Sequence, residues 1–476
     1  MRNWCSRLHR ARCWVNVAST RKTSINHHRM GVSLHPQHEE ALMQIWHETA
    51  NELPVTYDVD VLIVGGGPTG VAAATAAARA GEKTLLIERY GFCGGMATAG
   101  MSGAICGLFT SGKGPHEQLV HGFAGEFYQH LKHRGAVSDP FPFGETCLVV
   151  HEPHTWKEIA DDLLADSGAK VLFHTLATDV VMEGNQLRGV IIENKNGRQL
   201  ITARRFIDAT GDGDLCVKAG VPYTCGRNGM VQYPTMVFRM GNVDIARGIG
   251  HPVTQLETWV EAAQAKGFHL PRKHIYLLPS PRPGEVMCNV TSILRDDGRP
   301  IDATCAEDLT FAEQQGRKQV REYERFLRAW VPGFENAQLN DVAAQIGIRQ
   351  SRTIEGQRCL TNDDVFQAKK SQRAVASSAW CIEAHGQDGI FMFYLDNDWY
   401  DIPYDTLLPE DVPNLITAGR TLCAEHEALA SARVTAQCFL TGYAAGTAAY
   451  LSHRDCCAFD EIDVAELRSI IEYQTY

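Results

Sequence analysis

Three glycines and one acidic residue near the start of the chain have the spacing of a dinucleotide-binding motif. Gly65, Gly67 and Gly70 form the pattern G-x-G-x-x-G, and Glu88 follows after one further apolar segment. Such glycines allow a tight turn, the approach of a pyrophosphate to the backbone and close packing of a helix on a strand. A carboxylate at the position of Glu88 can accept hydrogen bonds from both hydroxyls of an adenosine ribose. These residues predict a bound dinucleotide; the alternative is a fortuitous glycine turn in another α/β unit.

The residues around the motif predict the strand–turn–helix–strand unit that such a site needs. The apolar run 59–64 is typical of a buried parallel strand, the alanine-rich residues 69–80 predict a helix, and residues 84–87 predict the next strand. The N-terminus of that helix would offer free N–H groups and the positive end of its dipole to a phosphate.

Two later turns are predicted to meet the same ligand. Residues 171–203 hold four short β runs divided by glycine turns, which predict a β-meander. The strand that follows ends in the acidic turn 210–214, and the strand 414–418 ends in Gly419 and Arg420. Because ligands of an open parallel sheet bind beyond the carboxyl ends of its strands, both turns should lie against the nucleotide.

The composition excludes several classes of protein. The chain has 476 residues, of which 44% are hydrophobic and 21% charged, as in ordinary globular proteins. Its net charge of −11 gives no reason to expect a nucleic-acid partner. We predict no membrane span and a cytoplasmic location with reduced thiols. Fifteen cysteines include no C-x-x-C pair, so we expect no bound metal.

The predicted fold class is α/β, a Rossmann-like domain with a parallel sheet and a β-meander, into which an α+β domain is inserted. Residues 51–225 and 395–455 form the nucleotide-binding domain, residues 226–394 the substrate or cap domain, and residues 456–476 a C-terminal tail. Residues 1–50 form a basic head that we expect to be disordered. For this head we favour a true start nearer Met30 over a transit peptide.

Four stretches carry a resemblance to a known family. They are VLIVGGGPTGVAAATAAARAGEKTLLIER with FCGGMAT; IDATGDGDL; GIRQSRTIEGQRCLTNDDV; and the segment from DIPYDTLLPEDVPNLITAGR to TGYAAGTAAYL. With them the chain resembles the FAD-dependent oxidoreductases that have a glutathione-reductase-type flavin domain. More narrowly, it resembles the branch related to the flavoprotein subunit of heterodisulfide reductase. The resemblance implies FAD, which we expect to be bound non-covalently.

The residues expected at FAD lie in the glycine motif, the Gly-Gly loop after Glu88, the meander, the two turns and the last long helix. They are Gly65, Gly67, Pro68, Thr69, Gly70, Glu88, Arg89, Gly94, Gly95, Met96, Ala97, Thr98, Val180, Ala209, Thr210, Gly211, Gly419, Arg420, Ala428 and Arg433. The resemblance implies that a backbone group of Val180 meets adenine. We expect the helix N-terminus near Ala428 to face the pyrimidine end of the flavin.

Three side chains are the candidates for catalysis. His426 has an ordinary pKa near neutrality and could serve as acid or base, although capping a helix is an equally good interpretation. Arg349 and Arg352, with Arg433, could hold a carboxylate, since guanidinium groups suit carboxylates. Bracing of domain contacts or of FAD is the stronger alternative for these arginines.

The function predicted from these residues is a dehydrogenase or oxidase that moves two electrons from a small organic substrate to flavin N5. The electron acceptor stays open, as does homo-oligomerisation. A second dinucleotide motif is absent from the sequence, which argues against an NAD(P)H domain. The alternatives are an electron-relay flavoprotein subunit without turnover of its own, and an NAD-binding protein without flavin.

Overall fold

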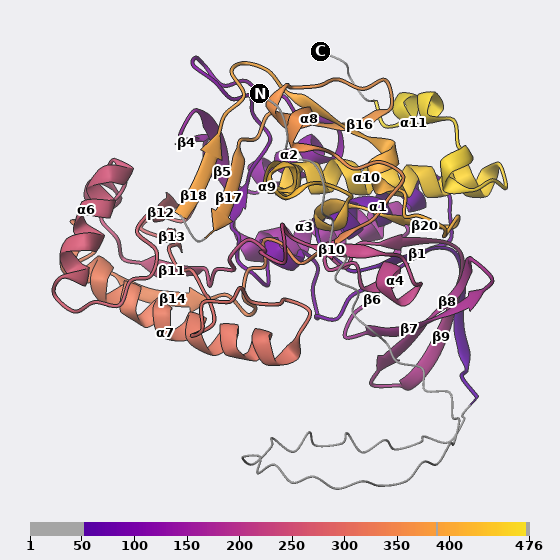
Figure 1. Ribbon diagram of the computed structural model, residues 1–476, viewed down its shortest axis with the longest axis horizontal. Coiled ribbons are helices and arrows are strands. Elements are labelled where there is room, and N and C mark those ends of the chain that lie inside the picture. The colour runs from indigo at the N-terminus through magenta and orange to yellow at the C-terminus, as the bar shows by residue number, and fades with distance from the viewer. Residues whose placement is uncertain (1–51, 387–388, 473–476) are drawn as a thin grey trace, which may run out of the picture. The chain divides into compact units, whose positions relative to one another are not determined.

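A seven-stranded sheet carries the glycine motif (Figure 1). The computed structural model describes residues 52–386 and 389–472, so the predicted head lies outside the described residues. The sheet has the order β6-β2-β1-β9-β8-β7, and β20 also pairs with β9. Its strands are β1 (Val55–Val64), β2 (Thr84–Ile87), β6 (Lys170–Leu172), β7 (Leu176–Glu183), β8 (Gln186–Asn194), β9 (Gly197–Asp208) and β20 (Leu415–Thr417).

The parallel strands end at the same edge of this sheet. Val64, the last residue of β1, is in register with Ile87 of β2 and with Asp208 of β9. Thr417 of β20 also pairs with Asp208. The glycine motif, Glu88 and the two predicted turns follow these strand ends directly, so the parallel register gathers them at one edge.

The β-meander is present but is shorter than the sequence predicts. β7, β8 and β9 are antiparallel neighbours, and β9 continues beyond β8 to pair in parallel with β1. The first of the four predicted runs is β6, which pairs in parallel with β2 through Leu85 and Lys170. The assignment of that run to the meander is therefore wrong, because the run forms β6, a parallel edge strand beside β2.

Two helices pack on each other beside the sheet, α1 (Pro68–Arg79) and α10 (Thr435–Arg454). Their contact is very close, because a Cβ atom on Gly442 or Gly446 of α10 would overlap the carbonyl oxygen of Thr69 or Ala73 of α1. Only glycine permits this backbone approach. The small residues of α10 therefore fix the position of α1. α2 (Gly122–His133) packs on α10, and α3 (Pro153–Ser167) packs on α1.

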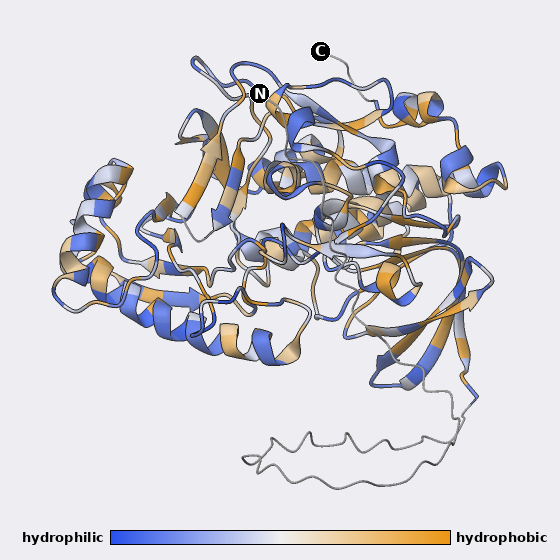
Figure 2. Ribbon diagram, viewed as in Figure 1, coloured by the Kyte–Doolittle hydropathy of each residue, from blue (hydrophilic) through white to orange (hydrophobic). Residues whose placement is uncertain are grey.

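A four-stranded antiparallel sheet and a long helix form a second core. The sheet has the order β12-β13-β11-β14, and the elements are β11 (Phe238–Gly241), β12 (Tyr276–Pro279), β13 (Val286–Asn289), β14 (Gln338–Val342), α6 (Val253–Gln264) and α7 (Ala306–Trp330). Buried residues recur along α7 at helical spacing, from Ala312 through Val320 to Phe326. Most of the remaining residues of α7 are hydrophilic (Figure 2).

The smaller elements connect these two cores. They are β3 (Ala104–Ile105), β4 (Phe141–Phe143), β5 (Thr146–Val150), α4 (Asp214–Lys218), β10 (Tyr223–Cys225), α5 (Ile245–Gly248), β15 (Arg352–Ile354), α8 (Asn362–Phe366), β16 (Ala374–Ser378), β17 (Ile382–Gly386), β18 (Gly389–Phe393), β19 (Tyr400–Pro403), α9 (His426–Ala432) and α11 (Val464–Ile470). Leu360, Val365 and Val375 pack in the same cluster as α1 and α10, although they lie before the predicted boundary at 394/395. The domain division stays a prediction.

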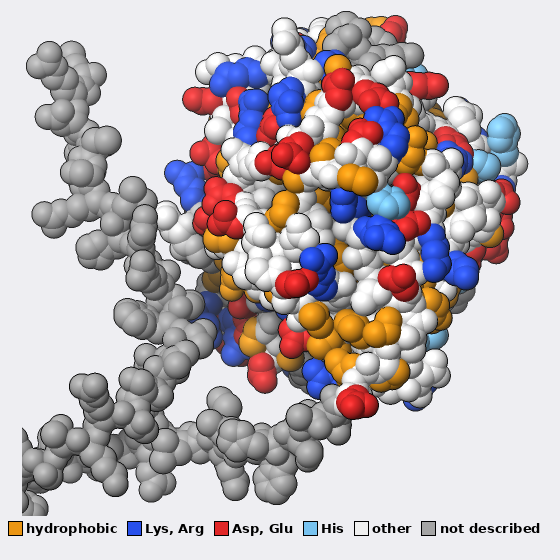
Figure 3. All heavy atoms as spheres, turned by 90° about the vertical axis from the view of Figure 1, so that its right-hand side faces the viewer, with side chains coloured by type: hydrophobic (Ala, Val, Ile, Leu, Met, Phe, Trp, Pro, Cys, Tyr) orange, Lys and Arg blue, Asp and Glu red, His pale blue; other side chains and the backbone are white. Residues whose placement is uncertain are grey.

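The C-terminal segment is folded where the structure describes it. In the predicted tail, α11 buries Val464 and Leu467 next to α10. Among the described helices, none combines the length and hydropathy that crossing a membrane requires. Figure 3 shows one face of the molecule, on which acidic and basic side chains are intermingled.

Candidate functional site

One cavity is bounded both by the glycine motif and by the four-stranded sheet. It opens to solvent, and the empty space along its lining, including that at its mouth, is about 1540 Å³. Of the residues predicted from the sequence, it is lined by Gly65, Gly67, Pro68, Thr69, Glu88, Arg89, Gly95, Met96, Ala97, Ala209, Thr210, Gly211, Arg349, Arg420 and Arg433. The structure therefore brings together segments from the whole length of the predicted flavin site.

The glycine motif has the geometry that its spacing predicts. Gly65 has φ +103°, and a Cβ atom there would overlap the carbonyl oxygen of Ala209. A Cβ atom on Gly70 would overlap the carbonyl oxygen of Gly65, so this glycine lets α1 pack on the turn without itself lining the cavity. Gly67 is the N-cap of α1, has no capping side chain, and has nothing within 4 Å of the position of a Cβ atom. The N-terminus of α1 is thus open to an anion.

Glu88 is fixed at the wall of the cavity. Its side chain is buried, its Oε2 accepts a hydrogen bond from Gly66 N at 2.6 Å, and its Oε1 accepts one from Tyr90 N at 2.9 Å. Each carboxylate oxygen keeps a second lone pair for a ribose hydroxyl. The neighbouring Arg89 is exposed and lies over the Tyr90 ring at 5.1 Å.

The Gly-Gly loop turns back onto the motif. Gly94 N donates a hydrogen bond to Gly66 O at 2.7 Å, and Gly95–Ala97 form a short 3₁₀ helix (η1) along the cavity. Gly94 and Thr98 do not line the cavity. Instead, Thr98 Oγ1 donates to Cys93 O at 3.0 Å and so closes the loop. Like Gly70, these two residues shape the site from behind.

The acidic turn after β9 holds Arg420 in place. Asp208 is fully buried and accepts hydrogen bonds from Thr210 N, Thr210 Oγ1 and Cys216 N at 2.7–3.0 Å. Burial raises the pKa of Asp208, and these bonds oppose the shift. Beyond it, Asp212 Oδ1 accepts from Arg420 Nη2 at 2.8 Å. Gly419 does not line the cavity; it packs so closely on Thr69 that a Cβ atom there would overlap Thr69 Oγ1.

The last predicted helix is two helices, and this corrects the role expected of Ala428. The helix is interrupted between α9 and α10, at Arg433 and Val434. The N–H of Ala428 is already bonded to Asn362 Oδ1 at 2.9 Å, and Ala428 does not line the cavity. Val434 and Thr435 do line it. The helix N-terminus at the cavity is therefore that of α10.

His426 lies outside this cavity, which corrects its prediction as the acid or base at the flavin. It lines a separate cavity with Arg227, Asn362 and Phe391. Burial lowers the pKa of His426, and its Nδ1 is buried without a hydrogen-bond partner. The side chain is close to Arg420 and Arg433 in sequence, and the charge of Arg433 also lowers its pKa, but His426 lines a different cavity from these two arginines.

Two further residues that were predicted at the site, Arg352 and Val180, also do not line the cavity. Arg352 donates to Asp214 Oδ1 at 2.8 Å and Asp212 O at 3.1 Å, so its charge is paired within the acidic turn. Val180 lies in the middle of β7, packs in the core beside the sheet, and does not line the cavity. The residue that precedes β7, Thr175, does reach the site, because its N–H donates to Glu88 O at 3.0 Å.

Sequence reasoning missed the wall that faces the motif. It consists mainly of Phe143, Leu148, Val237, Tyr276, Leu278, Met287, Asn289 and Glu383. Alternate residues of β12 and β13 contribute to it, as expected of strands with one face toward a cavity. This alternation of residues along the two strands can be seen in the sequence, but it does not show which face of each strand points toward the cavity.

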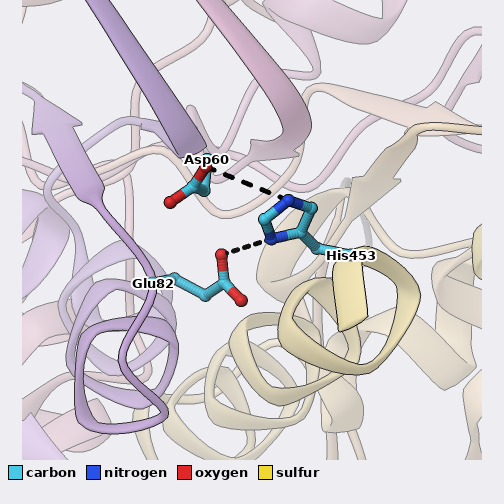
Figure 4. A group of neighbouring side chains, drawn as sticks. All are labelled: Asp60, Glu82 and His453. Carbon is cyan, nitrogen blue, oxygen red and sulfur yellow. Dashed lines mark hydrogen bonds and ion pairs between the residues drawn. The ribbon is translucent and has the colours of Figure 1, made fainter. Parts of the chain in front are cut away.

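Within the described chain, one group of side chains could meet a cation, namely Asp60, Glu82 and His453, whose ligand atoms lie within 4.8 Å of one another (Figure 4). His453 Nδ1 is 2.7 Å from Glu82 and its Nε2 is 3.9 Å from Asp60. Arg204 also pairs with Asp60 at 3.4 Å. These contacts tie α10 to β1 and to the start of β2, away from the cavity.

A protein-family model for FAD-dependent oxidoreductases matches residues 60–471. The chain belongs to the FAD-dependent oxidoreductase family. The match spans the glycine motif, the second sheet and the returning strand, and FAD is the cofactor of this family.

Among curated proteins, the chain is similar to thiamine thiazole synthases. It is 32% identical to that of Methanococcus aeolicus over 163 residues, which cover 32% of this chain and 55% of the relative. It is 30% identical to that of Saccharolobus islandicus over 175 residues, which cover 34% of this chain and 59% of the relative. The chain spans little more than half the length of the curated relatives it matches.

Two solved structures are also similar to the chain. A geranylgeranyl bacteriochlorophyll reductase-like protein from Thermoplasma acidophilum is 16% identical with a TM-score of 0.48, and the match covers 87% of this chain and 83% of that one. A flavoprotein/dehydrogenase from Cytophaga hutchinsonii is 15% identical with a TM-score of 0.43, and the match covers 87% and 84%.

The residues of the cavity fit FAD. The uncapped N-terminus of α1 and the open space at Gly67 suit a pyrophosphate, and the anchored carboxylate of Glu88 suits a ribose. The N-terminus of α10 and the apolar side chains of β12 and β13 lie along the same cavity. These groups would hold the nucleotide at one part of the cavity and the flavin ring at another.

Proposed function

We propose that this oxidoreductase moves two electrons between a small organic substrate and FAD, as a dehydrogenase or an oxidase. The observation that carries the proposal is the continuity of one cavity. Gly67 and Glu88 line one part of it, and Val237, Leu278 and Met287 line another. A nucleotide site that opens directly onto an apolar wall leaves room for a substrate beside the ring of the flavin.

When bound, FAD supplies a ring that exchanges two electrons with a substrate as a hydride or its equivalent. The chain binds and orients the two partners. Its apolar wall excludes water, which strengthens electrostatic interactions inside the site. The N-terminus of α10, with Val434 and Thr435 at the cavity, favours negative charge beside it.

Two finer points belong to the same proposal. The stretches FCGGMAT and GIRQSRTIEG support a place in the branch related to the flavoprotein subunit of heterodisulfide reductase. The cysteine pattern supports a cytoplasmic protein with reduced thiols. The thiazole synthases match only a third of this chain, so their reaction is not part of the proposal.

Anaerobic bleaching tests the proposal. The protein is loaded with FAD and mixed with panels of alcohols, amines, amino acids and hydroxy acids, and the flavin absorbance at about 450 nm is followed. We expect at least one class to bleach the flavin, and oxygen, a quinone or a carrier protein to restore it. A protein that holds FAD but is reduced only by ferredoxin or a partner subunit would be an electron relay, and the proposal would fail.

A further inference from the structure

The wall of the cavity opposite the glycine motif holds more positive than negative charge. Arg349 and Arg433 line it, and the buried Arg272 lies next to them. Among the described residues, Glu383 is the one carboxylate that acts on all three guanidinium groups. Three positive charges therefore face one negative charge in a place shielded from water.

The other charged groups nearby do not change this balance. Arg420 is paired with Asp212, and Arg352 with Asp214. His385 donates from Nε2 to Glu383 at 2.9 Å, and burial together with the charge of Arg349 puts the pKa of His385 well below its usual range, so it is neutral. Burial alone would raise the pKa of Glu383, but the bond from His385 and the charges of Arg349 and Arg433 lower it.

Neutral oxygens, not carboxylates, position the arginines. Asn289 Oδ1 accepts from Arg272 Nη1 at 2.9 Å and from Arg349 Nη2 at 3.2 Å. Arg349 Nη1 donates to the carbonyl of Tyr233 at 2.6 Å, and Arg433 Nη2 donates to Gln232 Oε1 at 2.8 Å. Such contacts fix the geometry of the guanidinium groups and leave their charge uncompensated.

Several donors in this cluster have no acceptor among the residues that the structure describes. Arg272 Nη2, Arg433 Nε and the hydroxyl of Tyr276 are buried without a hydrogen-bond partner. Tyr276 is 8% exposed and lines the cavity, and its ring lies 5.1 Å from the Arg272 guanidinium. Buried donors and buried positive charge are both costly unless an acceptor with negative charge joins them.

We propose that the substrate carries a carboxylate that binds to Arg349 and Arg433, with Arg272 as the positioning residue behind them. This inference rests on the proposed function, because it names the chemistry of the substrate of the same cavity. The carboxylate would bring the charge of the cluster closer to zero and supply the missing acceptor.

The side chains that line the cavity next to the arginines indicate the chemistry of the rest of the substrate. Phe143, Leu148, Leu278 and Met287 line the cavity beside the cluster. The rings of Phe143 and Tyr276 are 4.8 Å apart, so they form one apolar surface next to the arginines. The class that fits is a small organic acid with one carboxylate and an apolar body.

Paired ligands test the inference on the FAD-loaded protein. Propionate, butyrate and benzoate are compared with propionamide, butyramide and benzamide, which have similar shapes without the charge. Binding is read from the change in the flavin spectrum and, independently, from the shift in melting temperature. We expect at least one acid to bind about 10-fold or more tightly than its amide, in line with the strength of charge-assisted hydrogen bonds.

Arg349→Gln and Arg433→Gln should each reduce that preference to less than about threefold while FAD stays bound. The exposed Arg321, which pairs with Glu324 on α7, provides the matched control Arg321→Gln, and that variant should keep the preference. If an arginine variant does not fold, the comparison of acids with amides on the unaltered protein still decides.

Two results would overturn the inference. One is equal binding of every acid and its amide. The other is variants that release FAD yet keep the preference for acids, which would assign the arginines to the cofactor. A protein that never takes up FAD would instead refute the proposed function. Bleaching by uncharged substrates alone would refute only the inference that the substrate carries a carboxylate.

Discussion

Gly67→Ala should leave the fold intact and weaken FAD binding. A Cβ atom at Gly67 meets nothing within 4 Å, and the residue has φ −67° and ψ −178°, which alanine adopts without strain. The stability of the FAD-free protein should therefore change by no more than about 0.5 kcal/mol.

The loss should appear in the affinity for FAD. The added methyl group would occupy the space through which a pyrophosphate reaches the N-terminus of α1. Loss of one hydrogen bond to a charged group costs about 1.5–3 kcal/mol. The dissociation constant of FAD should accordingly rise about 10- to 100-fold.

Gly70→Ala is the control, because it should act on the fold. Its Cβ atom would overlap the carbonyl oxygen of Gly65, so α1 must shift, at a cost of about 1–3 kcal/mol in the FAD-free protein. Urea unfolding measures the stability of both variants, and fluorescence titration measures FAD binding. Wild-type FAD affinity in Gly67→Ala, or equal destabilisation by the two changes, would refute the assignment of these glycines.

Three further predictions follow from the same geometry. His426→Ala should leave the rate of flavin reduction within about twofold, because the side chain lies outside the cavity, and stopped-flow reduction slowed 10-fold or more would restore it as a catalytic candidate. Gly446→Ala should destabilise the protein by about 1–3 kcal/mol in urea unfolding, since its Cβ would overlap Ala73 O, whereas unchanged stability would show that α1 and α10 can separate freely. The bond from His385 and the charges of Arg349 and Arg433 lower the folded-state pKa of Glu383 below its ordinary value of 4.5, so its contribution to stability is present above about pH 4.5 and is lost as the pH falls below that value. Glu383→Gln should remove part of that acid dependence of stability, and an unchanged profile of unfolding free energy against pH would contradict the shift.

The nucleotide half of the site could be predicted from the sequence because its geometry is local. Gly65, Gly67 and Gly70 are held by the turn that they form, and Glu88 ends the next strand in register with it. Parallel pairing then brings the turns after β9 and β20 to the same edge. Where neighbours in sequence are also neighbours in space, residue types and spacing are sufficient.

The substrate half could not be predicted in the same way. Arg272, Arg349, Arg433 and Glu383 come from four separate segments, and only tertiary packing brings them together. Arg352 has the same residue type as Arg349 and lies three positions away, yet its partner is Asp214 in the acidic turn. The sequence therefore shows that arginines are present, but it does not show which of them lie at the cavity.

Competition for a side chain limits prediction even at short range. A threonine followed three residues later by an acid is a typical helix start, and Thr361 begins α8 with such a capping box to Asp364. The similar pattern at Thr304 fails, because the Thr304 hydroxyl donates to Asp302 at 2.7 Å and Cys305 becomes the N-cap of α7. The two segments differ in a nearby acid that satisfies the hydroxyl first.

The break between α9 and α10 shows why such details matter for function. The residues at the break, Arg433 and Val434, include neither proline nor glycine, so the local sequence does not predict that the helix is interrupted here. Val434 takes ψ 164° and starts a new helix, which gives the cavity a helix N-terminus that an unbroken helix would lack. The same break leaves Arg433 free to reach Gln232 and join the arginine cluster. One backbone change therefore supplies both the helix end expected near the flavin and a guanidinium group for the substrate.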